Sequence, residues 1–534
     1  MKTTSLNGIW EFCFTKDYTE TPLFNSMITV PGCFDVMPGK FGKRGCGHYR
    51  RKVFTNGGKI MLTFDGCGVH AAFYWDGVQI GKTVLAYNRE ELIFDSGDAG
   101  EHELMVVTDN FLSQEPSEQF KFFYDFYAFG GIYSDVYLTE FEPEDIRHLA
   151  VIPLDHTTGE VKIQVECFEK NPETLKIAFD NGAEEEIPFA SEFVKKVPAF
   201  KVWSPETPAL HTLTVNGKSV SFGIRTLDWS GKRLLLNGKE IKLIGCNRHE
   251  SHPEFGPATP ENLILTDLTA IKEQGFNFVR GSHYPQKEFT LEVCDRIGLL
   301  VWEEALGWGN HEPELTDPGF CDNEAEQCRR MVRKSINHPS VIIWGFLNEA
   351  ETNKESVRPL IKRLRDTIRE QDQSRPVTFA SNRPAKDCCM DLVDILSLNI
   401  YPGWYDQIDC DPDGTTLIRP EFEKFAEQFK DVSKPMIVSE IGAAAIYGDH
   451  SGYRWSEEYQ TDLLKTVVNA ILDMDRYSGV ALWLFCDANT YVGTGHYLGR
   501  PRGFNNKGML TEHRKPKMSW YKLHELLIER GVVQ

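Results

Sequence analysis

The chain has 534 residues, and its 58 Lys and Arg against 78 Asp and Glu give a formal net charge of −20 at pH 7. This length exceeds one ordinary domain of roughly 100–200 residues, so two or three domains are expected. The negative charge argues against binding to nucleic acid through its phosphates and against docking on an anionic membrane.

The first 240 or so residues are predicted to be antiparallel β structure. Asn-Gly and Asp-Gly pairs supply the positive φ angles that two-residue hairpins require. Val161, Ile163 and Val165 are apolar at every second position, as in a strand with one buried face. The pairs begin at Asn7, Asn56, Asp65, Asp76, Asn181, Asn216 and Asn237.

A change of pattern near residue 143 indicates that this β region holds two domains. The segment "SDVYLTEF" ends the first group of strands, and "VKIQVECF", "LKIAFD" and "LTVNGKSVSFGI" form the second. Roughly 90 residues of such short strands fit one small sandwich. We therefore predict β domains over about 1–143 and 144–230.

From about residue 231, apolar runs alternate with amphipathic segments. Continuous apolar strands imply burial on both faces and hence a parallel sheet. One amphipathic segment, 355–373, carries Val357, Leu360, Ile361, Leu364 and Ile368 on one face. The runs are "IKLIGC", "FNFVRG", "LLVWEE", "VIIWGFLN", "PVTFAS", "DILSLN", "PMIVSE" and "VALWLF".

Eight such strands in about 300 residues predict a closed (β/α)₈ barrel, a TIM barrel, over 231–534. Thr259-Pro260-Glu261 is typical of a helix start, with a capping hydroxyl, a proline and an early acid. Catalytic residues of these barrels lie at the C-terminal ends of the strands. That rule selects Asn247, Arg248, His249, Glu250, Arg280, His283, Tyr284, Glu303, Glu304, Asn348, Glu349, Asn399, Tyr401, Glu440, Trp483 and Asp487.

Two of these carboxylates indicate hydrolysis of a glycosidic bond. Glu349 follows the fourth strand and Glu440 ends the seventh. A pair of carboxyls about 5–5.5 Å apart serves as nucleophile and acid/base with retention, whereas roughly 6.5–9.5 Å leaves room for an inverting water. A single glutamate after a strand often caps a helix or pairs with arginine, but two on opposite strands favour the catalytic interpretation.

No metal site or cofactor is predicted. His249, His252, Glu303 and Glu304 lie near the barrel mouth, yet no H-E-x-x-H pattern occurs. The 13 cysteines contain no C-x-x-C, so reduced thiols are expected. No apolar run approaches the roughly 18 residues of a membrane span, and the N-terminus lacks the apolar stretch of a secretory signal. These features predict a cytoplasmic protein.

Many ordered segments resemble glycoside hydrolase family 2, most closely its β-glucuronidase branch. The resemblance implies an N-terminal sugar-binding jelly-roll sandwich, an immunoglobulin-like sandwich and a catalytic barrel. It also implies a small glycoside as partner, either a uronide conjugate or an oligosaccharide end, and a homo-oligomer of two or four chains. The segments are "YDFYAFGGIYSDVYL", "GIRTLDWSGKRLLLNGKEI", "NRHESHP", "VRGSHYP", "HPSVIIWGFLNEAE", "LNIYPGWY", "PMIVSEIGA", "RWSEEYQ" and "FNNKGMLTEHRKPK".

The resemblance assigns a role to each candidate site residue. It implies that Glu349 is the acid/base and Glu440 the nucleophile of a retaining double displacement. Asn505 and Lys507 match an N-x-K motif that would hold the C6 carboxylate of a β-D-glucuronide, with Tyr405 assisting. The other implied sugar-site residues are Asn348 at the 2-hydroxyl, Arg280 and Tyr401 at the nucleophile, Trp483 at the floor, Asp125 from the sandwich, and His249 and His283 at the mouth.

Two departures keep other substrates open. The segment "NRHESHPEFG" looks more like the galactosidase branch, and Pro402 replaces a residue that is commonly tyrosine in glucuronidases. The nearest alternative is a β-galacturonidase or a dual uronidase, followed by a β-galactosidase. A non-catalytic carbohydrate-binding protein is the remaining alternative, and the presence of both Glu349 and Glu440 argues against it.

Overall fold

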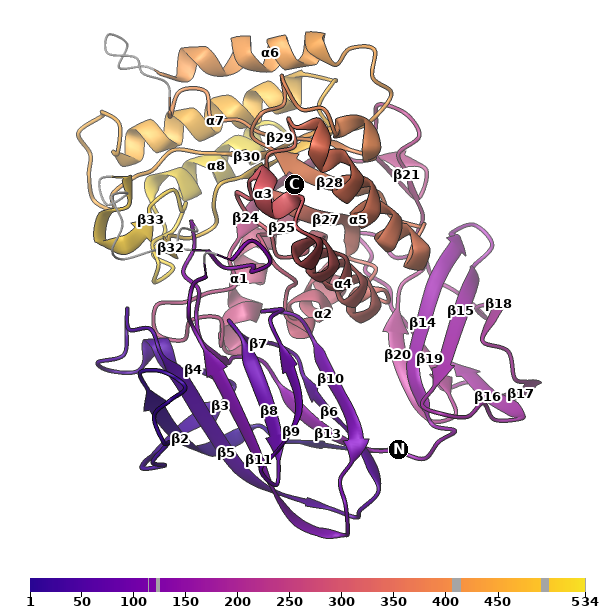
Figure 1. The fold of residues 1–534 in the computed structure, drawn as a ribbon. Helices are drawn as coiled ribbons and strands as arrows, with labels where there is room; N and C mark the ends of the chain where they lie inside the picture. The colour runs from indigo at the N-terminus through magenta and orange to yellow at the C-terminus, as the bar shows by residue number, and fades with distance from the viewer. Residues whose placement is uncertain (114, 122–124, 406–413, 491–498, 534) are drawn as a thin grey trace.

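The computed structural model describes residues 1–113, 115–121, 125–405, 414–490 and 499–533. The chain forms three regions in sequence order, and Figure 1 shows the N-terminal strands in indigo, a second β region in magenta and a barrel in pink to yellow. The predicted class of two β-sandwiches followed by a (β/α)₈ barrel is confirmed. The domain limits at residues 143 and 230 stay predictions.

The N-terminal region is a sandwich of a four-stranded sheet, β1-β13-β6-β10, and a six-stranded sheet, β3-β2-β5-β11-β8-β9. Its core includes Trp10, Phe34, Phe64 and Leu104, which are almost fully buried. A small third sheet, β4-β12-β7, adjoins them. The strands are β1 (Lys2–Ser5), β2 (Gly8–Thr15), β3 (Ser26–Val30), β4 (Gly32–Cys33), β5 (Cys46–Thr55), β6 (Lys59–Phe64), β7 (Cys67–Gly68), β8 (Ala71–Trp75), β9 (Val78–Thr83), β10 (Glu90–Asp95), β11 (Gly100–Asp109), β12 (Gly131–Ile132) and β13 (Val136–Glu140).

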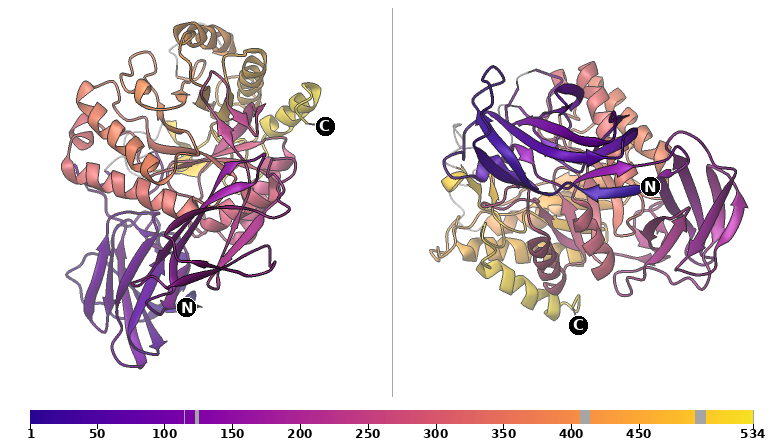
Figure 2. Two further views of the ribbon diagram at one scale, coloured as in Figure 1. Left: turned by 90° about the vertical axis from the view of Figure 1, so that its right-hand side faces the viewer. Right: turned by 90° about the horizontal axis from the view of Figure 1, so that it is seen from below.

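The second region is a smaller sandwich that lies beside the barrel (Figures 1 and 2). Its sheets are β14-β15-β18 and β17-β16-β19-β20, and Val161, Ile163 and Val165 are buried between them, as the alternation predicts. A short sheet, β21-β22-β23, leads into the barrel. The strands are β14 (Ile146–Asp155), β15 (Glu160–Cys167), β16 (Thr174–Phe179), β17 (Glu185–Pro188), β18 (Glu192–Lys196), β19 (His211–Val215), β20 (Lys218–Phe222), β21 (Leu227–Asp228), β22 (Leu235–Leu236) and β23 (Lys239–Glu240).

The hairpin prediction holds at some Asn-Gly and Asp-Gly pairs and fails at others. The pairs at Asp76, Asn216 and Asn237 join β8 to β9, β19 to β20 and β22 to β23, and both residues of each pair have positive φ. The prediction is wrong at Asn7, Asn56 and Asp65, because the strands on either side of these pairs do not hydrogen-bond to each other. The glycine of such a pair can also provide the backbone freedom that the chain needs where it crosses from one sheet to another.

The barrel closes in sequence order, with every neighbouring pair of strands parallel. All eight predicted strand runs are present, and every residue of each strand is buried. Burial on both faces is the physical reason that they lack polar alternation. The strands are β24 (Leu243–Arg248), β25 (Phe278–Gly281), β26 (Leu300–Glu304), β27 (Val341–Asn348), β28 (Val377–Ser381), β29 (Leu396–Asn399), β30 (Met436–Ile441) and β31 (Gly479–Leu482).

Helices cover the outside of the barrel, and the face predicted for residues 355–373 is buried. One detail is wrong: the Thr259 hydroxyl donates to Gly256 O at 3.3 Å, and Pro260 caps α1 without a side-chain hydrogen bond. Only a 3₁₀ turn, η3 (Met390–Leu392), separates β28 from β29. No described helix is long and apolar enough to cross a membrane. The helices are α1 (Glu261–Glu273), α2 (Glu288–Ile297), α3 (Glu312–Leu315), α4 (Pro318–Ser335), α5 (Arg358–Gln371), α6 (Ile418–Gln428), α7 (Glu457–Asp473) and α8 (Met518–Glu529).

An aromatic cluster joins the N-terminal sandwich to the barrel mouth. Tyr87 and Phe126 of the sandwich pack with Tyr284 of the barrel, and the rings of Tyr87 and Tyr284 stack with centroids 3.9 Å apart. Phe126 also contacts the ring of His249, with centroids 5.1 Å apart. This packing holds the segment that carries Asp125 at the rim of the barrel.

Candidate active site

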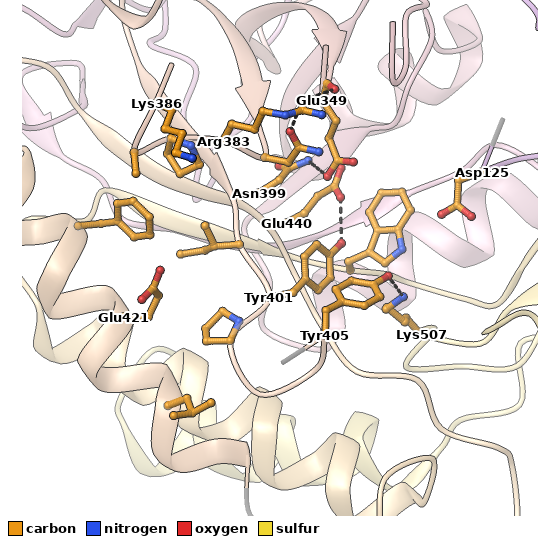
Figure 3. A pocket seen from close by; sticks show the side chains of 18 of the residues that line it. Asp125, Glu349, Arg383, Lys386, Asn399, Tyr401, Tyr405, Glu421, Glu440 and Lys507 are labelled. Carbon is orange, nitrogen blue, oxygen red and sulfur yellow. Dashed lines mark hydrogen bonds between the residues drawn. The ribbon is translucent and has the colours of Figure 1, made fainter. Parts of the chain in front are cut away.

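A pocket of about 1300 Å³ lies at the C-terminal ends of the barrel strands. Figure 3 shows Glu349 and Glu440 near its centre, with Asp125 and Lys507 on one side. Seven predicted site residues line it, and five others (His249, Arg280, His283, Asn348 and Asn505) are buried outside its lining. The seven are Asp125, Glu349, Tyr401, Tyr405, Glu440, Trp483 and Lys507.

Glu440, near the end of β30, is held by two donors. Arg280 Nη1 donates to its Oε1 at 2.9 Å, and the Tyr401 hydroxyl donates to its Oε2 at 2.9 Å. Burial raises the pKa of Glu440, and both donors oppose that rise because they stabilise the carboxylate. The contacts fix the orientation of the carboxylate and favour its ionised form.

Arg280, on β25, connects several buried groups. Its guanidinium donates to both oxygens of Glu304 at 2.9–3.0 Å and to Asn348 Oδ1 at 2.9 Å. Glu304 is fully buried and gives Arg280 a second carboxylate partner besides Glu440. A fixed bidentate pair of this kind keeps the guanidinium in position for Glu440.

Glu349 directly follows β27 and has a φ of 55°, while Leu347 before it has 51°. Such angles cost a residue with a side chain roughly 1–3 kcal/mol. Asn399 Nδ2 donates to Glu349 Oε1 at 3.0 Å. Burial, and next the negative charge of Glu440, raise the pKa of Glu349 to about 8. The neutral acid is therefore the main form of Glu349 near pH 7.

Asn348 has one buried donor without a partner. Its Oδ1 accepts hydrogen bonds from Arg280 and from Asn399, which fixes the amide orientation. Its Nδ2 is buried and makes no hydrogen bond within the described part of the chain. An unpaired buried donor costs free energy, which a hydrogen-bond acceptor brought to this N–H would recover.

Trp483 follows β31 and lines the pocket, with two histidine rings against it. The ring of His283 stacks on Trp483 with centroids 5.3 Å apart, and the ring of His249 meets it edge-on at 5.5 Å. Burial keeps the pKa of both histidines well below the usual value, so both rings are neutral. Both rings pack against the Trp483 indole and help to fix its position.

Lys507 is almost fully buried at the other side of the pocket. Its ammonium donates to the Tyr405 hydroxyl at 2.8 Å and lies 4.9–5.7 Å from the ring centroids of Tyr401, Trp404 and Tyr405. No described carboxylate lies within ion-pair distance of it. Burial, and next the positive charge of Arg500, lower the pKa of Lys507 to about 7.

Asp125 closes this side of the pocket and pairs with Arg500. The guanidinium of Arg500 donates to both Asp125 oxygens at 2.7 Å, and Asn505 Nδ2 donates to Asp125 Oδ2 at 3.1 Å. Asn505 Oδ1 accepts from the backbone N–H of Lys507 at 3.3 Å. The contacts link the sandwich to the loop that carries Lys507.

The interpretation of the sequence missed the contacts of three neighbours of the site. Glu304 and Asn399 stand at strand ends and were selected there, but without a role. Arg500 was not selected, because nothing in its Gly-Arg-Pro context marks an arginine that binds Asp125. Within the described ranges, no group of three or more His, Cys, Asp or Glu side chains is placed to hold a metal ion.

Comparison with known proteins gives consistent matches. Residues 228–529 match the family described as glycosyl hydrolases family 2, TIM barrel domain. The chain is 26% identical over 521 residues to a β-glucuronidase of Paenibacillus borealis, with 89% of this chain and 86% of that protein covered. It is 31% identical over 431 residues to the β-glucuronidase of Chlorocebus aethiops, covering 76% of this chain and 65% of that protein.

A solved structure matches almost the whole chain. The crystal structure of a β-galacturonidase of family 2 from Eisenbergiella tayi, bound to galacturonate, superposes with a TM-score of 0.88 at 30% sequence identity. The match covers 99% of this chain and 97% of the other. Both β-sandwiches and the barrel therefore share one arrangement with that enzyme.

Proposed function

Since the chain belongs to glycoside hydrolase family 2 and is a glycoside hydrolase, we propose that it hydrolyses β-D-hexuronides, with β-D-glucuronides as the preferred substrates. One observation carries the choice of an acidic sugar. The pocket that holds Glu349 and Glu440 also holds Lys507, a buried cation with no described carboxylate partner.

The C6 carboxylate of the sugar is bound by Lys507, Asn505 and Tyr405. A carboxylate gives the buried ammonium a charge-assisted partner that a neutral hydroxymethyl group does not provide. The Asn505 amide lies next to Lys507, and the Tyr405 hydroxyl already contacts the ammonium at 2.8 Å. Binding of the anion raises the pKa of Lys507 from about 7, because it favours the charged form.

Hydrolysis proceeds by double displacement with retention. A carboxylate oxygen of Glu440 attacks the anomeric carbon, the glycosidic C–O bond breaks, and Glu349 donates its proton to the leaving oxygen. Glu349 then takes a proton from water, whose oxygen displaces Glu440 from the anomeric carbon. The products are the free uronic acid and the alcohol.

The protonation states of the two carboxyls support these roles. Glu349 must be protonated in the first step, and its pKa of about 8 keeps the proton on it at neutral pH. Glu440 must be ionised, and Arg280 and Tyr401 stabilise its carboxylate. Two carboxyls whose surroundings favour opposite states are typical of an acid and a nucleophile.

Asn348 stabilises the transition state through the 2-hydroxyl of the sugar. Its Nδ2 is a buried donor held in a fixed orientation by Arg280 and Asn399. A hydrogen bond to this hydroxyl strengthens as the sugar gains oxocarbenium character. Trp483 forms the floor on which the sugar ring packs.

β-D-galacturonides are the second candidate, supported by the likeness of nearly the whole chain to the Eisenbergiella tayi β-galacturonidase. Glucuronides and galacturonides share the C6 carboxylate and differ in the configuration at C4. Lys507 and Asn505 serve both sugars equally, so the choice depends on groups that reach the 4-hydroxyl, and Asp125, which lines the pocket and pairs with Arg500, is our candidate for that contact.

Values of kcat/KM on the 4-nitrophenyl β-glucuronide, β-galacturonide and β-galactoside test the proposal. Both uronides are expected to exceed the galactoside, and the glucuronide to exceed the galacturonide. A higher kcat/KM on the galacturonide would make β-D-galacturonides the preferred substrates and β-D-glucuronides the second candidate. A galactoside preference would refute recognition of the carboxylate.

A further inference from the structure

The pocket extends well beyond the space that one sugar ring needs. Its volume of about 1300 Å³ exceeds the roughly 300–1000 Å³ of an ordinary small-molecule site. The additional space lies between the loop after β28 and the start of α6, on the left in Figure 3. We call this part the outer groove and define it by Arg383, Pro384, Lys386, Leu417, Pro420 and Phe425.

The outer groove begins on the leaving-group side of the catalytic carboxyls. Arg383 Nη1 donates to the backbone oxygen of Glu349 at 3.4 Å, so the groove starts beside the proposed acid. That acid protonates the oxygen of the leaving group, which must therefore lie next to Glu349. Figure 3 shows Lys507 and Asp125 on the opposite side of Glu440, where the sugar carboxylate is bound.

One wall of the outer groove is apolar. Leu417 ends η4 (Gly414–Leu417), and Pro420 and Phe425 lie on α6. Pro384 lines the pocket from the loop after β28. Several apolar side chains along one cavity favour a ligand with an apolar body over a fully hydroxylated one.

The groove is positively charged in a protein of net charge −20. Arg383 and Lys386 have no carboxylate within ion-pair distance among the residues that the structure describes, whereas Lys424 and Glu421 pair with each other at 2.9 Å. The backbone N–H of Lys386 donates to Arg383 O at 2.8 Å, so both cations belong to one turn. Two uncompensated charges therefore face the leaving-group side.

We propose that the outer groove binds a leaving group with an apolar body and an anionic substituent, and that Lys386 pairs with the anion. The proposal rests on the function proposed above, because it takes the sugar side and the leaving-group side from that assignment. Its occupant is the aglycone of the substrate, an aromatic alcohol that carries a carboxylate, sulfonate or sulfate.

Two aryl β-D-glucuronides that differ in one charge test it. The aglycones are a phenol with a para propanoate chain and the matching primary amide, because two methylene groups insulate the phenol oxygen from the substituent. We expect kcat/KM of the wild-type enzyme to be about fivefold higher for the carboxylate, the size of one exposed ion pair. The preference is expected to weaken with added salt.

Lys386→Glu is expected to reduce the carboxylate-to-amide ratio by about tenfold, and Lys386→Gln by about fivefold, through KM with kcat unchanged. Lys362→Glu on α5 has the same charge change at an exposed site outside the pocket and should keep the ratio. Equal rates for the two substrates, or equal effects of Lys386→Glu on both, would overturn the proposal. Absence of hydrolysis of 4-nitrophenyl glucuronide, whose aglycone is uncharged, would instead refute the proposed function.

Discussion

Glu440 and Lys507 lie on two sides of one pocket. The protein neutralises the charge of Glu440 more completely than it neutralises the charge of Lys507. Arg280 lies between Glu440 and Glu304, so each charge there has a charged partner within 3 Å. Lys507 is as deeply buried, yet its ammonium contacts only a hydroxyl and aromatic faces within the described chain. Under the proposed roles, the protein itself neutralises the catalytic carboxylate, whereas the ammonium that recognises the sugar gains its charged partner only from the substrate.

Loss of Glu440, the proposed nucleophile, is the largest expected effect. Glu440→Gln should lower kcat/KM on every glycoside by about 10⁴-fold or more, because no covalent intermediate forms. Glu349→Gln should retain activity on substrates with very acidic leaving groups, which need no proton. Steady-state rates on 4-nitrophenyl and alkyl glucuronides measure both, and wild-type rates of either variant on alkyl glucuronides would contradict the assignment.

Lys507→Met separates recognition from catalysis. The variant should lose about 100-fold in kcat/KM on the nitrophenyl glucuronide, the effect of a buried charge-assisted contact and its unpaired carboxylate. The small activity on the nitrophenyl galactoside should change little, because that sugar has no carboxylate. A parallel loss on both substrates would show that Lys507 supports the fold of the site instead.

The pH dependence of kcat/KM compares the Lys507 side of the pocket with the side of the catalytic carboxyls. Under the proposed roles, substrate binding requires protonated Lys507, with a pKa of about 7, and proton donation requires protonated Glu349, with a pKa of about 8. Both are lost as pH rises, so kcat/KM on an alkyl glucuronide, whose leaving group needs the proton of Glu349, should fall tenfold per pH unit above 7 and more steeply above 8. On the matching alkyl galactoside the fall should begin only near 8. Initial rates between pH 4 and 10 measure this.

A last comparison concerns stability and uses two buried lysines. Lys517 pairs with Asp487 at 2.8 Å and also donates to two backbone oxygens, so Lys517→Met should destabilise the fold by about 3–5 kcal/mol. Lys507→Met should instead stabilise the protein at pH 7. The folded state holds the pKa of Lys507 at about 7, below its unfolded value, so burying its charge costs free energy until pH rises past 10.5.

Thermal unfolding of the two variants and the wild type at pH 7 measures these changes. The midpoint should fall for Lys517→Met and rise for Lys507→Met. A fall of similar size for both would mean that the folded protein neutralises the charge of Lys507 as fully as that of Lys517. The distinction between the two sides of the pocket would then be lost.

The barrel was predictable from the sequence because its strands are buried on both faces and stand out as apolar runs. The same rule placed Glu349 and Glu440 at strand ends. It did not distinguish Glu303 from Glu304, which are adjacent in β26, although only Glu304 contacts Arg280. Alternation along a strand separates two such neighbours, but the sequence does not say which one faces the barrel interior.

Contacts between distant segments were not predictable. Arg500 and Asp125 lie 375 residues apart, and no local pattern links them. The turn pairs at Asn7, Asn56 and Asp65 failed as hairpins for a related reason, because the partner of each strand is set by sheet order in three dimensions. The site roles, the domain limits, the oligomer and the cytoplasmic location stay predictions.

The ion pair between Asp125 and Arg500 also bears on when enzymatic activity returns during refolding. One wall of the pocket comes from the first quarter of the chain and its partner from the last tenth, so the wall exists only after the sandwich has docked on the barrel. Contacts at such a sequence separation close late in folding. During refolding, uronide hydrolysis should therefore recover later than the circular dichroism signal of the helices. The rate at which hydrolysis recovers would then measure how fast the sandwich docks on the barrel.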